Sequence, residues 1–415
     1  MSAILAKQAP TDATTWAAWR MLALGVAAQA AGTLLVSTPA YLIPLLHTVH
    51  GMPLAHAGLL AAAPLIGTML ALVAWGAMAD RFGERWVIAG GMALTSLFAF
   101  AAVPVDGYVA LGVLLVFGGA ASASTSSASG RVVVGWFPRQ RRGLAMGIRQ
   151  MSQPLGVALA ALTVPGLAAR YGLWAPLLLA ACVTLVLALA CAWGIRNPPR
   201  PTATVVPGGA AGSAPRPAPV RPSNPYARDR FLHRIHAMSM LLVVPQFALS
   251  TFGLVWLTTG LGWSAAAAGA VMAASQFIGA LGRIGVGMLS DRVGSRVRVL
   301  RWVSISGVVV MLALAAAGAL GWPAAGAAVL VVATMVSVAD NGLAFTSVAE
   351  VAGPAWSGKA LGIQNTGQFL VAAIVGPAIG ALIAATSYPI TFALVALTPL
   401  AALGLVPRDD PAGSA

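Results

Sequence analysis

Twelve long apolar runs determine what this chain can fold into. They lie at residues 20–46, 54–79, 86–104, 108–136, 143–169, 173–195, 234–259, 264–290, 299–319, 322–350, 358–384 and 388–406. A helix that crosses the hydrocarbon core of a bilayer needs about 20 apolar residues. Because 59% of the residues are hydrophobic and only 8% are charged, the chain cannot cover a globular surface in water. The sequence predicts an all-α integral membrane protein with twelve transmembrane helices.

Two pairs of similar segments divide the chain into related halves. The stretch GAMADRFGER at 76–85 returns as GMLSDRVGSR at 287–296, and AMGIRQ at 145–150 returns as ALGIQN at 360–365. The first pair is 211 residues apart and the second is 215 apart, so the repeat covers whole halves. We expect two six-helix bundles, at 1–195 and 234–415. Residues 196–233, rich in Pro, Gly, Ala and Arg, are predicted to be a solvated cytoplasmic linker.

The basic residues indicate how the chain is oriented. Of the 24 Lys and Arg, nearly all those in loops fall on one side if the N-terminus is inside, and Arg170 stands out on the other. Cytoplasmic loops retain positive charge, so we expect both termini to be cytoplasmic. The formal charge of +14 is then a topology signal, and we expect no nucleic-acid partner. The excess of Arg over Lys and the abundant Ala favour a bacterial cell (inner) membrane.

The repeated pattern G-x-x-x-D-R-x-G-x-R resembles the hallmark loop of the major facilitator superfamily. GPAIG at 376–380 is similar to that family's glycine-proline packing motif. The resemblance covers nearly the whole chain and implies two six-helix bundles that rock around a central cavity. The segment 111–119 lacks the Arg that proton-driven drug exporters of the family carry early in the fourth helix, which disfavours drug efflux.

The repeated loops are candidates for a cytoplasmic gate. A carboxylate at the end of a helix can pair with a neighbouring arginine or cap a helix of the opposite half. The alternative is that these residues only fix loop shape and topology. The predicted gate residues are Asp80, Arg81, Arg85, Asp291, Arg292, Arg296, Arg131 and Glu350.

Arg283 is a candidate ligand for a substrate. It lies two helical turns before Asp291, about 12 Å inside the cytoplasmic edge. GRIGVGMLSD at 282–291 is similar to the eighth helix of monocarboxylate and oxalate/formate-type carriers, which implies an Arg that meets a carboxylate. Gly279 replaces the acid that some of those carriers place one turn earlier. The alternatives are an Arg283 that extends to the cytoplasm or one that pairs with Asp340.

Arg149, in the fifth apolar run, is the corresponding candidate in the first half. Gln150 follows it, and Gln364 and Asn365 occupy the repeat-related place in the second half. Two arginines, one from each half, could close around an anion and link its binding to rocking. The alternative is a hydrogen bond from Arg149 to a backbone carbonyl of a neighbouring helix.

Asp340 is the acid that the sequence places deepest in an apolar run, with Asn341 beside it. A charge in the hydrocarbon is costly and marks a functional candidate. Asp340 could carry a coupling proton, or it could be the permanent counter-ion of Arg283 or Arg149. Three further residues are predicted to line the cavity from the first and seventh helices: Tyr41, Gln246 and Trp256.

The sequence thus predicts a secondary transporter of a small organic anion, a mono- or dicarboxylate, that works by alternating access and is coupled to protons. The alternatives are an efflux carrier for drugs or hydrophobic compounds and, from another class, a membrane solute sensor that moves nothing. No nucleophile–base pair, metal cluster or phosphate-binding loop is recognisable, so we expect no enzyme activity, no cofactor and no metal. The expected partners are the anionic substrate, protons and the lipid bilayer, with the protein a monomer.

Overall fold

The computed structural model describes residues 12–137, 145, 148–196, 224–228 and 230–409. Every regular element in these ranges is a helix. Twelve helical segments are long and apolar enough to cross a membrane, which is the number predicted from the apolar runs. Most predicted ends fall within a few residues of the observed ones.

The first half supplies six of these segments. They are α1 (Asp12–Thr48), α2 (Leu54–Phe82), α3 (Glu84–Ala102), α4 (Tyr108–Trp136), the span Ile148–Tyr171 that contains α6 (Ser152–Tyr171), and α7 (Trp174–Gly194). Prolines lie inside α1, α2 and α6. Membrane helices tolerate them because neighbouring helices satisfy the freed backbone groups. Large apolar side chains such as Val73, Val109 and Trp193 are 78%, 84% and 86% exposed, which suits contact with lipid.

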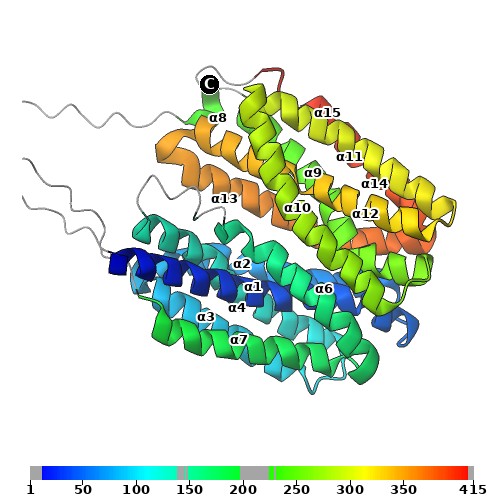
Figure 1. Ribbon diagram of the computed structural model, residues 1–415, viewed down its shortest axis with the longest axis horizontal. Helices are drawn as coiled ribbons and strands as arrows, with labels where there is room; N and C mark the ends of the chain where they lie inside the picture. The colour runs from blue at the N-terminus through cyan, green and yellow to red at the C-terminus, as the bar shows by residue number, and fades with distance from the viewer. Residues whose placement is uncertain (1–11, 138–144, 146–147, 197–223, 229, 410–415) are drawn as a thin grey trace, which may run out of the picture.

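Residues 197–223, most of the predicted linker, lie outside the described residues, and the short helix α8 (Pro225–Arg228) lies in the described remainder of the linker, before the second half. Its membrane helices are α9 (Phe231–Val255) with the π-helical turn η1 (Trp256–Gly260), α10 (Ala265–Val293), α11 (Arg296–Ala319), α12 (Pro323–Ser337), α13 (Asp340–Ala385), α14 (Tyr388–Val395) and α15 (Leu397–Leu405). Figure 1 shows the two halves as two packed groups of helices.

Helix α13 contains parts of two spans. The predicted run 322–350 is broken at Val338 and Ala339, where α12 ends and α13 begins with Asp340. The amide of Gln368 donates to Asn341 Oδ1 at 3.0 Å, although the two residues are 27 positions apart in α13. A straight helix would separate them by about 40 Å, so α13 folds back on itself. The predicted separation of a tenth and an eleventh span therefore holds, as spans Pro323–Ala352 and Lys359–Ala385.

In both halves the repeated motif places a glycine with positive φ directly after the helix. Gly83 follows α2 with φ of 81°, and Gly294 follows α10 with φ of 64°. A residue with a Cβ atom rarely adopts positive φ, which explains why glycine occupies the same place in both copies. After the second turn, the side chain of Ser295 caps α11 by accepting a hydrogen bond from the amide of Arg298.

The two halves are held together near the loops 49–53 and 261–264. We call this the outer end of the molecule, and the end where α1 begins the inner end. A Cβ atom on Gly58 of α2 would lie less than 3.0 Å from the carbonyl group of Gly376 in α13. One on Gly269 of α10 would lie equally close to the carbonyl of Ala161 in α6. Glycine therefore allows backbone-to-backbone contact between the halves at the outer end.

The described glycines near the inner end make no such close contacts. Gly76 in α2 and Gly287 in α10 are repeat-related and lie near the inner ends of their helices, and a Cβ atom on either would meet nothing within 4 Å. Among the described glycines, the close backbone approaches between halves lie toward the outer end. The structure is thus the state in which the outer end is closed.

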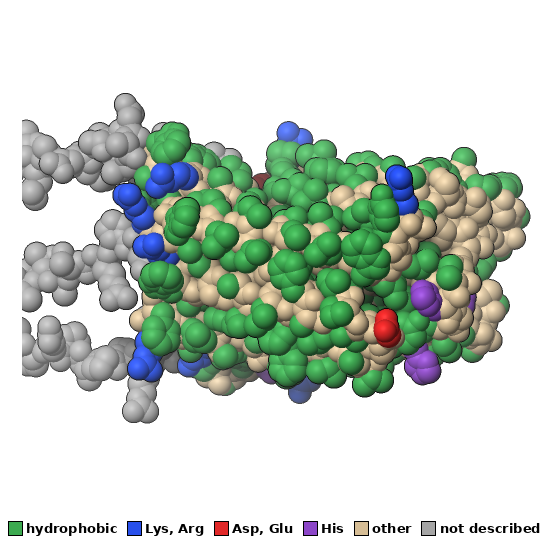
Figure 2. Space-filling model, turned by 90° about the horizontal axis from the view of Figure 1, so that it is seen from below, with side chains coloured by type: hydrophobic (Ala, Val, Ile, Leu, Met, Phe, Trp, Pro, Cys, Tyr) green, Lys and Arg blue, Asp and Glu red, His purple; other side chains and the backbone are tan. Residues whose placement is uncertain are grey.

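Charge is distributed along the same axis. In Figure 2 most of the visible Lys and Arg side chains gather at the left end, whereas the flanks between the ends are mostly apolar. The start of α1 and the C-terminal mark lie at this same end in Figure 1. The arrangement matches a chain with an even number of spans and a basic inner face.

Candidate functional site

Arg149 is anchored inside the first half. Its Nε donates to Ser129 Oγ at 2.8 Å, and its Nη2 donates to the carbonyl of Ser126 at 2.9 Å. Ser129 in turn donates to Gln29 Oε1 on α1 at 3.0 Å. These bonds to neutral acceptors fix the position of the half-buried guanidinium.

Arg283 and Asp340 face each other in the second half. Arg283 is half-buried, its Nε lacks a hydrogen-bond partner in the described structure, and its charge interacts with that of Asp340. Asp340 is 1% exposed. Neither of its carboxyl oxygens has a hydrogen bond of normal geometry to a described residue, although the Ser239 hydroxyl is close enough to interact. The two charges are therefore neighbours without a direct ion pair in the part of the chain that is described.

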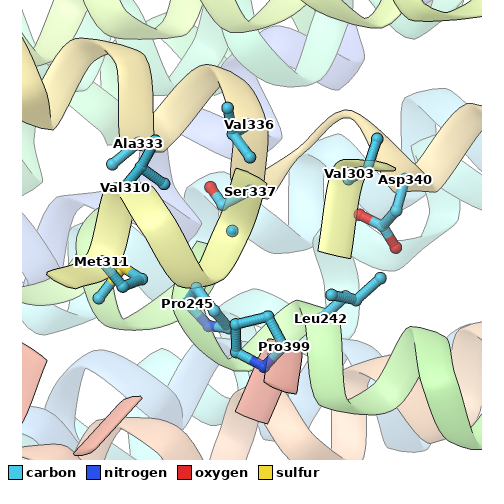
Figure 3. A pocket seen from close by; sticks show the side chains of 11 residues that line it. Leu242, Pro245, Val303, Val310, Met311, Ala333, Val336, Ser337, Asp340 and Pro399 are labelled. Carbon is cyan, nitrogen blue, oxygen red and sulfur yellow. The ribbon is translucent and has the colours of Figure 1, made fainter. Parts of the chain in front are cut away.

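A small cavity lies beside Asp340 within the second half. The space in which the centre of a water molecule fits is about 10 Å³. One buried water needs about this much. Figure 3 shows the carboxyl group of Asp340 on one side and the hydroxyl of Ser337 on the other. Leu242, Val303 and Pro399 contribute to the apolar remainder of the wall. Asp340 thus lies inside one bundle, beside a cavity whose lining offers it few polar groups.

The predicted amide ligands bond to one another. Asn341 donates to Gln246 Oε1 at 3.0 Å, and the amide of Gln368 donates to Ser239 Oγ at 2.7 Å and to Asn341. Gln364 is 1% exposed and bonds through Oε1 to Nδ1 of His236. These residues join α9 to both arms of α13, and in this state their polar groups are largely committed.

Two predicted amide ligands have other surroundings. Asn365 donates to the carbonyl of Leu361 in its own helix at 3.0 Å. Gln150 is exposed, next to the anchored Arg149. The amide of Gln150 is therefore accessible, and it lies next to Arg149, a predicted substrate ligand.

The two predicted aromatic ligands are packed away in this state. Tyr41 is 2% exposed and belongs to the main apolar core. Trp256 is 1% exposed and packs edge-on against Phe392, with ring centroids 5.1 Å apart. Trp256 also borders a cavity of about 510 Å³ at the outer end, together with Thr259 and Tyr388. Both aromatic residues act here as packing groups.

Three of the predicted gate residues form bonds within their own halves. Arg85 Nε donates to the carbonyl of Ala192 at 2.7 Å, and Arg296 forms an ion pair with Glu350 at 2.7 Å. The remaining described members are exposed near the inner end: Arg81, Asp291 and Arg292. The side chains of Asp80 and Arg131 lie outside the described part of the structure.

Two polar residues of this region were not predicted from the sequence: His236 and Ser239. His236 is 8% exposed and lies five residues into a membrane helix. The rule that ionisable residues inside a span are functional candidates would have identified it. Ser239 carries no such signal, because hydroxyl groups are common in membrane helices.

Comparison with known proteins identifies the family. The sequence matches the family model of the Major Facilitator Superfamily over residues 22–377. The chain belongs to this superfamily. It is 44% identical to "Uncharacterized MFS-type transporter Rv2994" of Mycobacterium tuberculosis (strain ATCC 25618 / H37Rv) over 391 residues, which cover 94% of this chain and 85% of that protein. It is 43% identical to "Uncharacterized MFS-type transporter MT3072" of strain CDC 1551 / Oshkosh over 391 residues, with the same coverage.

Solved structures support the same fold. A bacterial homolog of the human lysosomal transporter Spinster, in an inward-facing and occupied conformation, superposes with a TM-score of 0.73 at 14% identity and covers 96% of this chain and 95% of that chain. A D-xylose–proton symporter superposes with a TM-score of 0.68 at 16% identity, covering 92% of this chain and 97% of that chain. At these identities the likeness concerns the fold alone. The chain is a multi-pass membrane transporter with the two-bundle fold of the superfamily.

Proposed function

We propose that this transporter moves a small organic anion, a mono- or dicarboxylate, together with a proton into a bacterial cell. The observation that carries this proposal is that each half has one arginine inside a span: Arg149 at the inner start of the span Ile148–Tyr171 and Arg283 further inside the span Ala265–Val293. An arginine in the hydrocarbon region is costly and is retained where it faces water, a partner or a substrate. Both guanidinium groups are half-buried, which leaves part of each accessible.

A carboxylate suits these two groups chemically. Arg283 has a buried Nε without an acceptor in the described structure, and a guanidinium binds two carboxylate oxygens through parallel donors. Arg149 is held in position by Ser129 and Ser126 and needs little reordering to bind a ligand. An anion that contacts both arginines would favour the state in which the halves close around it, which couples binding to rocking.

Asp340 is proposed as the proton carrier. Its carboxyl group is buried beside Arg283 and lacks hydrogen bonds of normal geometry to described residues. A buried carboxylate requires compensation by a positive charge or by a proton. Movement of Arg283 between states would change that compensation, so Asp340 could bind and release a proton in each cycle.

The orientation with both termini cytoplasmic is part of the proposal. It is supported by the basic inner end and by the closed outer end with its few charged groups. The Arg296–Glu350 pair and the exposed Arg81 and Asp291 lie where the halves would meet when the inner end closes. We assign these residues to the inner gate.

The direct test is ligand-dependent stabilisation of the purified protein, followed by counterflow in proteoliposomes. We expect mono- or dicarboxylates to raise the melting temperature, and this increase to disappear in Arg283→Ala and in Arg149→Ala. A matched control is Arg170→Ala, which removes an exposed arginine near the outer end. Stabilisation by organic cations instead would favour the drug-efflux alternative. Binding without counterflow would favour a sensor.

A further inference from the structure

Asp340 is isolated from water on all sides, which raises the question of how a proton reaches it. Its exposure is 1%, and the cavity beside it has room for about one water molecule. A carboxyl group that changes protonation in every cycle needs hydrogen-bonding groups or water that lead to the surface. The polar groups of α9 and α13 are arranged as such a path.

His236 lies at the start of this path. Its Nε2 is 2.9 Å from the hydroxyl of Tyr226, and its Nδ1 bonds to Oε1 of Gln364. Because a carbonyl oxygen only accepts, Nδ1 carries the proton in the neutral ring and Nε2 accepts from Tyr226. Tyr226 belongs to the short helix α8, outside the membrane spans and partly exposed. His236 is thus connected to the inner surface through one hydroxyl group.

Ser239 continues the path toward Asp340. It lies three residues after His236, on the same face of α9. The rise of a helix places His236 about 8 Å and Ser239 about 12 Å beyond the start of α9. Ser239 accepts from Gln368 and is close to the carboxyl group of Asp340. Titratable and hydroxyl groups therefore follow one another inward from the inner end and stop at Asp340.

We propose that protons reach Asp340 from the inner side through the interior of the second half, with His236 as the relay group and Ser239 as the last hydroxyl before the acid. This inference rests on the proton coupling in the proposed function. It assigns the proton a route inside one bundle, separate from the substrate route between the bundles.

The transfer balances in two steps. A proton from the inner side binds Nε2 of neutral His236 and forms an imidazolium. The imidazolium then gives up its Nδ1 proton to the Ser239 hydroxyl, which passes its own proton to the carboxylate of Asp340. The products are a neutral imidazole and a neutral carboxylic acid, and the return of the proton reverses both steps.

The described titratable and charged groups near the two ends of this route are few. His236 faces Tyr226 from α8 and Gln364 from α13, and it senses His233 on its own helix. Asp340 faces Arg283 from α10. Among the charged and titratable groups of the described structure, His233 is the one whose charge acts on His236, and Arg283 is the one whose charge acts on Asp340.

The test uses infrared spectroscopy of the purified protein and needs no substrate. The chain has only 10 Asp and Glu in all, so the difference between native protein and Asp340→Asn can assign the carboxylic acid band of Asp340. After transfer into D₂O, the shift of this band gives the rate at which its proton exchanges. We expect His236→Gln to slow the exchange about tenfold or more, and Ser239→Ala to slow it as well. The control His56→Gln makes the same change at an exposed outer position and should have no effect.

Each outcome is decisive. If both path variants exchange at the native rate, the route is wrong, while the proposed role of Asp340 stands. If the native protein shows no carboxylic acid band from Asp340 at any pH at which it is folded, Asp340 does not carry a proton. In that case the route and the proton coupling fail together. Because no carboxylate is added, the result does not depend on the proposed substrate.

Discussion

The close contact between Gly58 and Gly376 gives the sharpest prediction. In Gly58→Ala the added Cβ atom would lie less than 3.0 Å from the Gly376 carbonyl, whereas ordinary contacts are 3.4–4 Å. The obstacle is backbone, which cannot rotate away. Helices α2 and α13 must therefore separate by roughly half an ångström or more, and overpacking of this kind costs about 1–3 kcal/mol. Such a cost changes the ratio of outer-closed to outer-open molecules about 5- to 150-fold.

Distances between spin labels can measure this ratio. Val49 and Leu320 are 69% and 57% exposed and lie at the outer ends of the first and second halves. Labels on cysteines at these positions, with Cys182 and Cys191 replaced by serine, should report mainly the closed outer end in the native background. Outer-open molecules should give a longer distance between the two labels. We expect Gly58→Ala to increase the fraction of molecules with this longer distance.

The control for this experiment lies on the same helix. Gly76→Ala adds the same methyl group to α2 where nothing lies within 4 Å, so the distance distribution should remain native. If Gly58→Ala and Gly76→Ala give the same distribution, glycine contact at the outer end does not hold this state. If Gly58→Ala and Gly76→Ala change the distance distribution equally, the change comes from the higher helix propensity of alanine and not from the contact with Gly376.

Three further predictions concern single side chains. Trp256→Ala removes a 1% exposed indole and should cost about 3–5 kcal/mol, seen as a lower melting temperature while the affinity for carboxylates at the arginines is unchanged. Glu350→Gln breaks an exposed ion pair and should cost less than about 1 kcal/mol, so a gate role would appear as a changed transport rate at an unchanged melting temperature. Gln368→Leu removes the amide that donates to both Ser239 and Asn341 and should cost about 1–3 kcal/mol, measured as a lower melting temperature. The control Gln153→Leu makes the same change at an exposed position and should leave the melting temperature unchanged.

The fold was predictable because the bilayer imposes simple rules. A span must be about 20 apolar residues long and must satisfy its backbone internally, so the number and approximate ends of the helices follow from hydrophobicity. Local irregularities do not follow from these rules. The π-helical turn at Trp256–Gly260 and the break before Asp340 depend on packing between helices, which leaves no mark on the apolar pattern.

The candidate site was predictable in part. The cost of charge in lipid identified Arg149, Arg283 and Asp340 from sequence position alone. The same argument could not show which side chains face a neighbour. Tyr41 lies in α1 and Gln246 in α9. A membrane helix is apolar all round, so the sequence of neither helix distinguishes the face toward the cavity from the face that packs against a neighbour. The structure places Tyr41 in the core and Gln246 in an amide network.

The arrangement of Arg283 and Asp340 suggests why anion and proton would travel together. A single guanidinium faces a single buried carboxyl group, without a direct ion pair in the described structure. A substrate carboxylate that binds Arg283 brings a second negative charge to the same cation. Two carboxylates at one guanidinium repel each other strongly in a region of low dielectric, so binding is favoured when Asp340 holds a proton. Under the proposed function, the proton is then the condition for binding the anion, and loss of that proton toward the inner side would release both.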